Sequence, residues 1–294
     1  MDGGARLAPG KTPVSEAITF WLGCNVLRHG DIVHACVDIL RALGVDAKVV
    51  GGPDYCCGSV KDANLATEAG MAKRTAQNMA AAGRARVVAW CPSCHAQMNE
   101  VISRAHQTPF SIGHFAELLL ERRAELAKLL AREVPLRVML HEHHAYDRRV
   151  PINAILAELL ALIPGVTVLQ GSYRAPGYMC SPLAAMPPLM ERMCGRTVAQ
   201  ARSLGADALV TIYHQCHREL VGLDVDGHLP VHNYVQLMAR SMGIGYADEY
   251  RAWKAAGSGA KPLLGEARIA AVGEALVDRA LLPEFARRPW TPKR

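Results

Sequence analysis

Short apolar runs alternate along the chain with longer segments in which apolar residues recur every three or four positions. The short runs are typical of buried strands, and the longer segments are typical of amphipathic helices that cover a sheet. We expect strands at residues 17–22, 45–50, 86–90, 136–140, 166–170 and 208–213. We expect helices at residues 31–43, 64–82, directly after Cys94, and at 110–132, 152–162, 188–204 and 266–281.

This alternation favours an α/β fold with mostly parallel sheets and right-handed crossovers. The pattern starts again at Pro135, which gives an internal repeat with a period of roughly 120 residues. We therefore predict two tandem related α/β domains. The predicted divisions are a flexible N-terminal tail at 1–16, a first domain at 17–134, a second domain at 135–245 and a C-terminal extension at 246–294.

Composition indicates a protein with a packed core. Half of the 294 residues are hydrophobic and a fifth are charged, as in globular domains. The net charge of +6 is modest, and no run of Lys or Arg is interleaved with aromatic residues, so we do not expect nucleic-acid binding. The chain has no secretory signal pattern, and its best apolar stretch, 156–169, is interrupted by Glu158 and Pro164. We therefore expect a cytoplasmic protein without a membrane span.

Five cysteines of the first half follow the ends of predicted strands. Between Cys24 and the Cys56-Cys57-Gly58 triplet lie 31 residues, and 32 residues separate the triplet from Cys91-Pro92-Ser93-Cys94. Because the carboxyl ends of parallel strands share one edge of a sheet, these five thiols can converge. Thiolates are the usual ligands of iron–sulfur clusters, and clusters of cytosolic cysteines are more often metal ligands than disulfides. The spacing therefore predicts an iron–sulfur site.

The local sequence supports this prediction and leaves alternatives open. Pro92 fixes one backbone angle between Cys91 and Cys94, and Gly58 permits a turn beside the adjacent pair. A thioredoxin-type motif would use only two of the five thiols, and structural zinc would leave one unused. An odd total of nine cysteines argues against a disulfide framework. Five thiols exceed the four that an ordinary cluster uses, so either an unusual cluster takes all five or one remains reactive.

The second half keeps the spacing of the first but loses most of its sulfur. In the repeat, Cys180 stands opposite Cys57 and Cys216 stands opposite Cys94, whereas other residue types occupy the remaining three places. The candidate ligands of a second metal site are His144, Cys180, Cys194, Cys216 and His217. Two cysteines and two histidines would suit zinc or a Rieske-like centre. Whether this half binds a cluster, zinc or nothing stays open.

The motif formed by Cys24, Cys56-Cys57-Gly58 and Cys91-Pro92-Ser93-Cys94 resembles the cysteine-rich CCG domain, which occurs twice in the B-type chain of heterodisulfide reductases. The resemblance covers about residues 17–245, with an intact motif in the first half alone. It implies a noncubane [4Fe–4S] cluster bound by Cys24, Cys56, Cys57, Cys91 and Cys94, with Cys56 and Cys57 as catalytic residues. It also implies an oxidoreductase subunit that acts on a disulfide, a persulfide or protein-bound sulfur.

The same resemblance implies partners. A ferredoxin-like iron–sulfur subunit (C-type) and a flavin subunit (A-type) would belong to the same complex, and a lipoate-bearing or other sulfur-carrier protein would present the substrate. The Ala- and Arg-rich composition and the incomplete second motif favour the bacterial sulfur-oxidation type. The alternatives are a non-catalytic electron-relay or scaffold subunit, and the iron–sulfur subunit of a lactate, glycolate or fumarate oxidoreductase.

Overall fold

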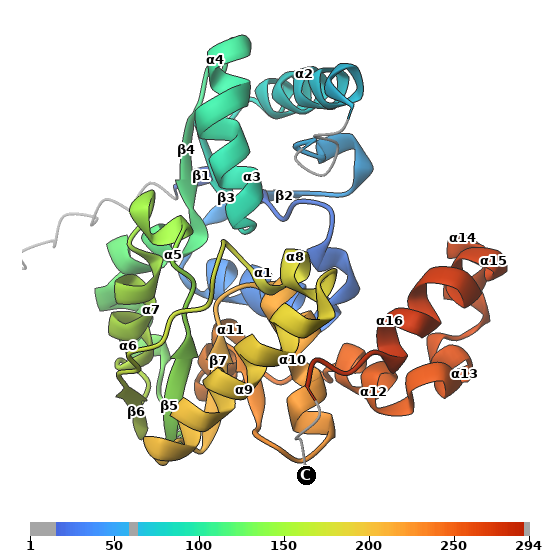
Figure 1. The fold of residues 1–294 in the computed structure, drawn as a ribbon. Coiled ribbons are helices and arrows are strands. Elements are labelled where there is room, and N and C mark those ends of the chain that lie inside the picture. Colours follow the sequence, from blue (N-terminus) through green and yellow to red (C-terminus); the bar gives the residue numbers. More distant parts are fainter. Residues whose placement is uncertain (1–15, 59–63, 291–294) are drawn as a thin grey trace, which may run out of the picture.

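A computed structural model describes residues 16–58 and 64–290, which form two parallel sheets, their covering helices and a set of C-terminal helices (Figure 1). The predicted flexible tail at 1–16 lies outside the described residues except for Glu16. The covering helices are α1 Gly30–Ala42, α2 Leu65–Ala81, α3 Pro92–Gln97, α4 Ser103–Ala105, α5 Phe115–Glu121, α6 Arg123–Leu129, α7 Ile152–Leu160, α8 Cys180–Ala184, α9 Pro187–Ser203, α10 His214–Val225 and α11 Tyr234–Ser241. The C-terminal helices are α12 Glu249–Ala256, α13 Lys261–Leu264, α14 Glu266–Val272, α15 Glu274–Leu276 and α16 Leu282–Ala286.

Each sheet has four parallel strands, and the two sheets have the same strand order. The first sheet runs β2-β1-β3-β4, and the second runs β6-β5-β7-β8. The strands are β1 Ala17–Trp21, β2 Asp46–Val50, β3 Arg86–Ala89, β4 Ser111–His114, β5 Leu136–His141, β6 Val166–Leu169, β7 Ala208–Thr211 and β8 Val231–Asn233. The predicted α/β fold in two related halves is therefore confirmed.

The two halves share one apolar core. Ile18 and Phe20 of β1 belong to the same buried cluster as Val138 and Leu209 of the second sheet. Helix α1 packs against α11 and α5 packs against α7, which joins the halves, and Figure 1 shows α1 between the two sheets. Trp21, on the opposite face of β1, belongs to a second cluster under α2 and α3. The period-two alternation along β1 thus buries both faces of this sheet.

The predicted helix at 110–132 is wrong in its first part and in its continuity. The structure has strand β4 at its start and two helices, α5 and α6, after it. His114 ends β4 and caps α5, because its Nδ1 accepts a hydrogen bond from the Ala116 N–H at 3.2 Å. Glu117 completes the capping box by accepting the His114 N–H at 2.7 Å. This box ends the strand and starts the helix within one residue.

The second half repeats this arrangement where no strand was predicted. Asn233 ends β8 and caps α11, accepting the Val235 N–H at 3.2 Å, and Gln236 accepts the Asn233 N–H at 2.7 Å. His114 and Asn233 therefore occupy equivalent positions in the two halves, at the carboxyl end of the fourth strand.

The C-terminal helices form a separate apolar cluster on α10. Tyr250, Trp253 and Phe285 pack on one another and on Val221 of α10. The predicted continuous helix at 266–281 is wrong: α14 ends at Val272 because Gly273 takes a left-handed φ of +90°, which interrupts the helix. Across residues 16–58 and 64–290, no helix has both the length and the apolar character needed to span a lipid bilayer.

Candidate functional site

The five cysteines of the first half surround one cavity at the carboxyl edge of the first sheet. Cys24 follows β1, the adjacent pair Cys56 and Cys57 follows β2, and Cys91 follows β3 and caps α3, which carries Cys94. The cavity has a volume of about 310 Å³, and all five cysteines line it. The structure thus brings together the three strand ends that the sequence places at a common edge.

These thiols lie close enough to affect one another. Burial, and after it the neighbouring thiols Cys56, Cys57 and Cys91, raises the pKa of Cys24 to about 12. Hydrogen bonds with Cys57 and Cys91, and after them burial, raise the pKa of Cys94 well above its ordinary value. In the absence of a cation the thiols of Cys24 and Cys94 resist ionisation, because burial and neighbouring sulfurs disfavour the thiolate.

A glycine brings the backbone close to the thiols. Gly23 has a φ of +79°, and a Cβ built on it would lie 3.0 Å from Cys94 Sγ. A Cβ on Gly51, after β2, would lie 2.9 Å from the Gly23 carbonyl oxygen. A side chain at Gly23 would therefore press against the Cys94 sulfur, and the backbone conformation of this residue favours glycine.

We expect Gly23→Ala to lower the free energy of unfolding more than Gly44→Ala does. Both glycines have positive φ, +79° and +71°, so alanine should cost about 1–2 kcal/mol of backbone strain at either position. At Gly44 a Cβ has nothing within 4 Å, whereas at Gly23 it meets the Cys94 sulfur, which should add about 1–3 kcal/mol of overpacking. Urea denaturation of both variants measures the difference, and equal losses would contradict the close approach.

Residues of the second half complete the wall of this cavity. They are Tyr178, Met179, Ser181, Pro182 and Gln215. Ser93 Oγ lies 3.8 Å from Met179 Sδ, and the buried Arg218 of α10 donates hydrogen bonds to Asn25 Oδ1 at 3.0 Å and Ser181 Oγ at 2.7 Å. Sequence reasoning missed these residues. The sequence feature that could have identified them is their position close to Cys180 and Cys216, the two cysteines that the second half keeps in the repeat.

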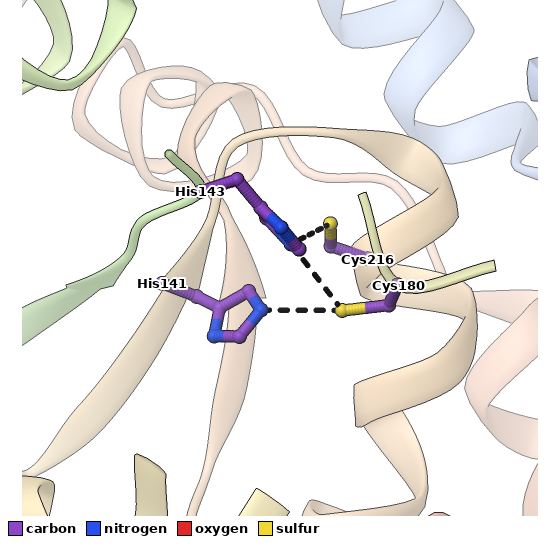
Figure 2. A group of neighbouring side chains, drawn as sticks. All are labelled: His141, His143, Cys180 and Cys216. Carbon is purple, nitrogen blue, oxygen red and sulfur yellow. Dashed lines mark hydrogen bonds between the residues drawn. The ribbon is translucent and has the colours of Figure 1, made fainter. Parts of the chain in front are cut away.

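A second group of metal-binding side chains lies at the corresponding edge of the second sheet (Figure 2). It consists of His141, His143, Cys180 and Cys216, whose ligand atoms all lie within 4.8 Å of one another. His141 Nε2 is 3.2 Å from Cys180 Sγ. His143 Nε2 is 3.6 Å from Cys180 Sγ and 3.3 Å from Cys216 Sγ. We call these four residues the His₂Cys₂ group.

Of the five predicted second-site residues, Cys180 and Cys216 belong to the His₂Cys₂ group. The other three lie outside it. His144 is exposed, Cys194 is on α9, and His217 Nε2 lies 3.0 Å from Asp248 Oδ2.

The choice of histidines follows from the backbone after β5. The chain stays extended there, with the Ala175 N–H donating to the Glu142 carbonyl at 2.8 Å and the His144 N–H donating to the Ala175 carbonyl at 3.2 Å. Side chains alternate along extended chain, so His141 and His143 share one face and His144 takes the other. The structure therefore places His141 and His143, and not the predicted candidate His144, beside Cys180 and Cys216.

Within the His₂Cys₂ group, Cys216 and His143 each shift the pKa of the other. Burial opposes ionisation of Cys216, but its hydrogen bond with Cys180 and its contact with His143 outweigh burial and lower its pKa to about 5. Burial by itself would lower the pKa of His143, and the Cys216 sulfur instead raises it above its ordinary value. Without a metal, a thiolate and an imidazolium therefore stabilise each other in this buried place.

Comparison with known proteins finds a family model that matches the first half. It is described as a cysteine-rich domain, CCG, and it matches residues 18–99, the segment that contains all five converging cysteines. The chain is also 23% identical over 244 residues to the D-type chain of dihydromethanophenazine:CoB–CoM heterodisulfide reductase from Methanosarcina acetivorans. The alignment covers 77% of this chain and 59% of that relative, so the chain spans less than two thirds of its relative's length. The resemblance drawn from the cysteine motif is confirmed.

Three kinds of solved structure align with the chain at low similarity. An aspartate racemase homologue from Pyrococcus horikoshii is 10% identical, with a TM-score of 0.34 and coverage of 77% of this chain and 97% of that one. An arylmalonate decarboxylase is 17% identical, with a TM-score of 0.25 and coverage of 78% and 94%. A maleate cis-trans isomerase from Nocardia farcinica is 14% identical, with a TM-score of 0.29 and coverage of 78% and 93%. Scores this low carry no argument about the site.

Proposed function

We propose that this chain is an iron–sulfur oxidoreductase subunit that acts on sulfur–sulfur bonds. In this proposal a noncubane [4Fe–4S] cluster is bound by the five cysteines of the first half, with Cys56 and Cys57 at the reacting position. The observation that supports it best is the convergence of all five thiols, from three strand ends, around one cavity. The match of the CCG family model to the same segment agrees with it.

The residues around the cavity fit such a cluster. Its volume of about 310 Å³ corresponds to about ten water molecules at liquid density, enough for a small inorganic core. Bound iron would take the place of the thiol protons and remove the repulsion between neighbouring thiolates. Conversion of a disulfide into two thiolates takes two electrons, and the cluster, when bound, would pass them one at a time from an electron-donating partner subunit, or accept them in the reverse direction.

The protein's own residues divide the cavity into a buried floor and an accessible rim. Cys57 and Cys94 are buried, whereas Tyr178 and Pro182 are exposed and Cys24 is half-buried. A substrate sulfur would therefore approach from the rim, between the second-half wall and Cys24. An exposed rim suits sulfur that is carried on an extended arm of another molecule, because the rest of the carrier can remain outside the cavity.

The proposed partners follow from this geometry and from the relative. The relative is named as one chain of a heterodisulfide reductase, so we propose a complex in which a ferredoxin-like iron–sulfur subunit and a flavin subunit exchange electrons with the cluster. A lipoate-bearing or other sulfur-carrier protein would present a disulfide, a persulfide or protein-bound sulfur, as in bacterial sulfur oxidation. The cytoplasmic location stays a prediction.

Metal analysis of anaerobically purified protein tests the cluster. We expect about four iron atoms and a similar amount of acid-labile sulfide per chain in the wild type, as one [4Fe–4S]-type cluster requires. Cys57→Ser should lose most of this iron, because it removes one of the five ligands. Cys36→Ala is the matched control, since Cys36 is a fully buried cysteine on α1 that does not line the cavity. Equal iron in both variants, or zinc without iron in the wild type, would overturn the proposed ligand set.

Reactivity toward disulfides tests the proposed reaction separately. The reduced wild-type protein should be reoxidised by an organic disulfide, with release of two thiols for each disulfide consumed. The cluster signal is followed by visible absorption while released thiols are counted. A cluster that dithionite reduces but that no disulfide reoxidises would favour the electron-relay role over the reductase.

A further inference from the structure

The proposed function leaves the His₂Cys₂ group without a role. We propose that His141, His143, Cys180 and Cys216 form a closed zinc site, and that this site holds the second-half wall of the five-cysteine cavity in place. The site would replace, in the second half, the cluster that the first half binds at its equivalent edge. Its metal would have a structural role, distinct from the redox chemistry proposed for the five cysteines.

The distances within the group suit a single tetrahedral ion. Zinc binds sulfur at about 2.3 Å and imidazole nitrogen at about 2.0–2.1 Å, so neighbouring ligand atoms of a tetrahedral site lie about 3.3–3.8 Å apart. Three of the six separations between ligand atoms, all of them His–Cys, are 3.2, 3.3 and 3.6 Å, and all six are at most 4.8 Å. A Rieske-like centre places its histidines on one iron and its cysteines on the other, which would separate them further. These close contacts therefore favour one ion over a two-iron centre.

Burial and charge point to the same ion. All four side chains are at most 2% exposed, so an uncompensated charge would be costly here. Two thiolates and two neutral imidazoles around a divalent cation have no net charge. Sulfur and imidazole are also the ligands that zinc prefers, whereas magnesium and calcium prefer oxygen. Four protein ligands in a closed site leave no position for a substrate, as expected of structural zinc.

A hydrogen bond outside the group orients one ligand. His143 Nδ1 lies 3.1 Å from the Pro176 carbonyl oxygen, so its N–H can donate there while Nε2 faces both sulfurs. Histidines that bind metals commonly donate their other ring nitrogen in this way. The loop that contains Pro176 leads directly to Cys180, so one segment supplies both the orienting carbonyl and a ligand.

The same segments reach the first cavity. Cys180 lies between Met179 and Ser181, and Cys216 directly follows Gln215. Met179, Ser181 and Gln215 all line the five-cysteine cavity. A metal bound to the two cysteines would therefore fix the residues that form the second-half wall. Loss of the metal should loosen this wall without removing any thiol of the first half.

Zinc analysis of the purified protein tests the site independently of iron. The wild type should carry about one zinc per chain, as a single four-ligand site requires. His143→Ala and Cys216→Ser should each lose most of it, whereas His144→Ala, at the exposed neighbouring histidine, should retain it. Protein grown with cobalt in place of zinc should show the visible bands of tetrahedral cobalt and a sulfur-to-cobalt charge-transfer band. A wild type that takes up neither metal, or variants that keep their zinc, would overturn the site.

A separate measurement tests whether the zinc site holds the second-half wall of the five-cysteine cavity in place. In iron-free protein, removal of zinc by His143→Ala should speed alkylation of the half-buried Cys24 relative to His144→Ala, because the facing wall is loosened. Unchanged alkylation in a protein that has lost its zinc would refute the link. Iron binding by the five cysteines is scored separately in the wild type, so failure of the cluster proposal and failure of the zinc proposal give different results.

Discussion

Trp90→Ala is expected to lower the free energy of unfolding by about 4 kcal/mol, within the range for truncating a large buried aromatic side chain. Trp90 is 2% exposed and follows β3 directly before Cys91. Its ring stacks on Tyr234 at a centroid distance of 5.5 Å and meets Phe115 at 5.7 Å. Its Nε1 donates a hydrogen bond to His214 Nδ1 at 3.1 Å. Because Tyr234 and His214 belong to the second half, the substitution removes packing within the core that joins the halves.

Two further variants separate the contributions. Trp90→Phe keeps an aromatic ring in the core but removes the hydrogen bond to His214, so it should cost less, about 1–2 kcal/mol. Trp253→Ala removes a buried tryptophan from the C-terminal cluster and should leave the five-cysteine cavity unchanged. Chemical denaturation measures stability, and alkylation of Cys91 in iron-free protein measures exposure of the cavity. A loss below about 1 kcal/mol for Trp90→Ala would contradict its placement at the junction of the halves.

The strands that carry the first cysteine site could be predicted from the sequence because two independent signals coincide there. Apolar runs precede Cys24 and Cys91, and strands β1 and β3 are buried there as expected for parallel strands, whereas β2, which precedes Cys56 and Cys57, has a less continuous apolar run and is mostly exposed. The cysteines mark where these strands end, and parallel order forces those ends to one edge. Hydrophobic pattern and ligand spacing therefore predict the same place in the fold.

Strands β4 and β8 could not be recognised because they are short and continue directly into capped helices. The four-residue strand β4 and the three-residue strand β8 are too brief to establish a period of two against the helical spacing that follows. The cap of α5 is a histidine, which is not among the preferred N-cap residues. Asn233, the equivalent residue of the second half, is a preferred N-cap residue. Comparing the two halves at these two positions was therefore the one way in which the sequence could have indicated both helix starts.

A residue-by-residue alignment of the halves does not show which histidine lies beside Cys180, because it ignores side-chain direction. His144 occupies the aligned position of Cys24, but the first half turns at Gly23 with a φ of +79°. In the second half the aligned residue His143 pairs with Ala175 in a parallel bridge, and the turn begins only at His144. The face presented to Cys180 is consequently set by strand alternation, which a sequence reveals only when the end of the strand is known.

Buried histidines give the second large expected effect, a loss of stability in acid. Burial lowers the pKa of His114 to about 3. Burial, and after it the charges of His217 and His214, lowers the pKa of His29 well below 6.5, and neither ring nitrogen of His29 has a hydrogen-bond partner among the described residues. Both rings therefore stay neutral in the folded protein. In the unfolded chain they take up protons at their ordinary pKa of 6.5.

Because the unfolded state binds more protons below pH 6.5, the free energy of unfolding must fall as the pH falls. His114 should contribute a loss of about 2 kcal/mol between about pH 7.5 and pH 5, at about 1.4 kcal/mol per pH unit below 6.5. His29 should add a loss in the same direction. His114→Asn copies the cap that Asn233 provides in the second half, so it should preserve α5 and reduce the acid loss by about 2 kcal/mol. The substitution His34→Asn, at an exposed histidine of α1, is the control. Urea denaturation at both pH values measures these losses, and metal loss in acid cancels in the comparison because all three proteins keep the cysteine and His₂Cys₂ residues. An acid loss in His114→Asn equal to that of the wild type would show that His114 is protonated in the folded protein.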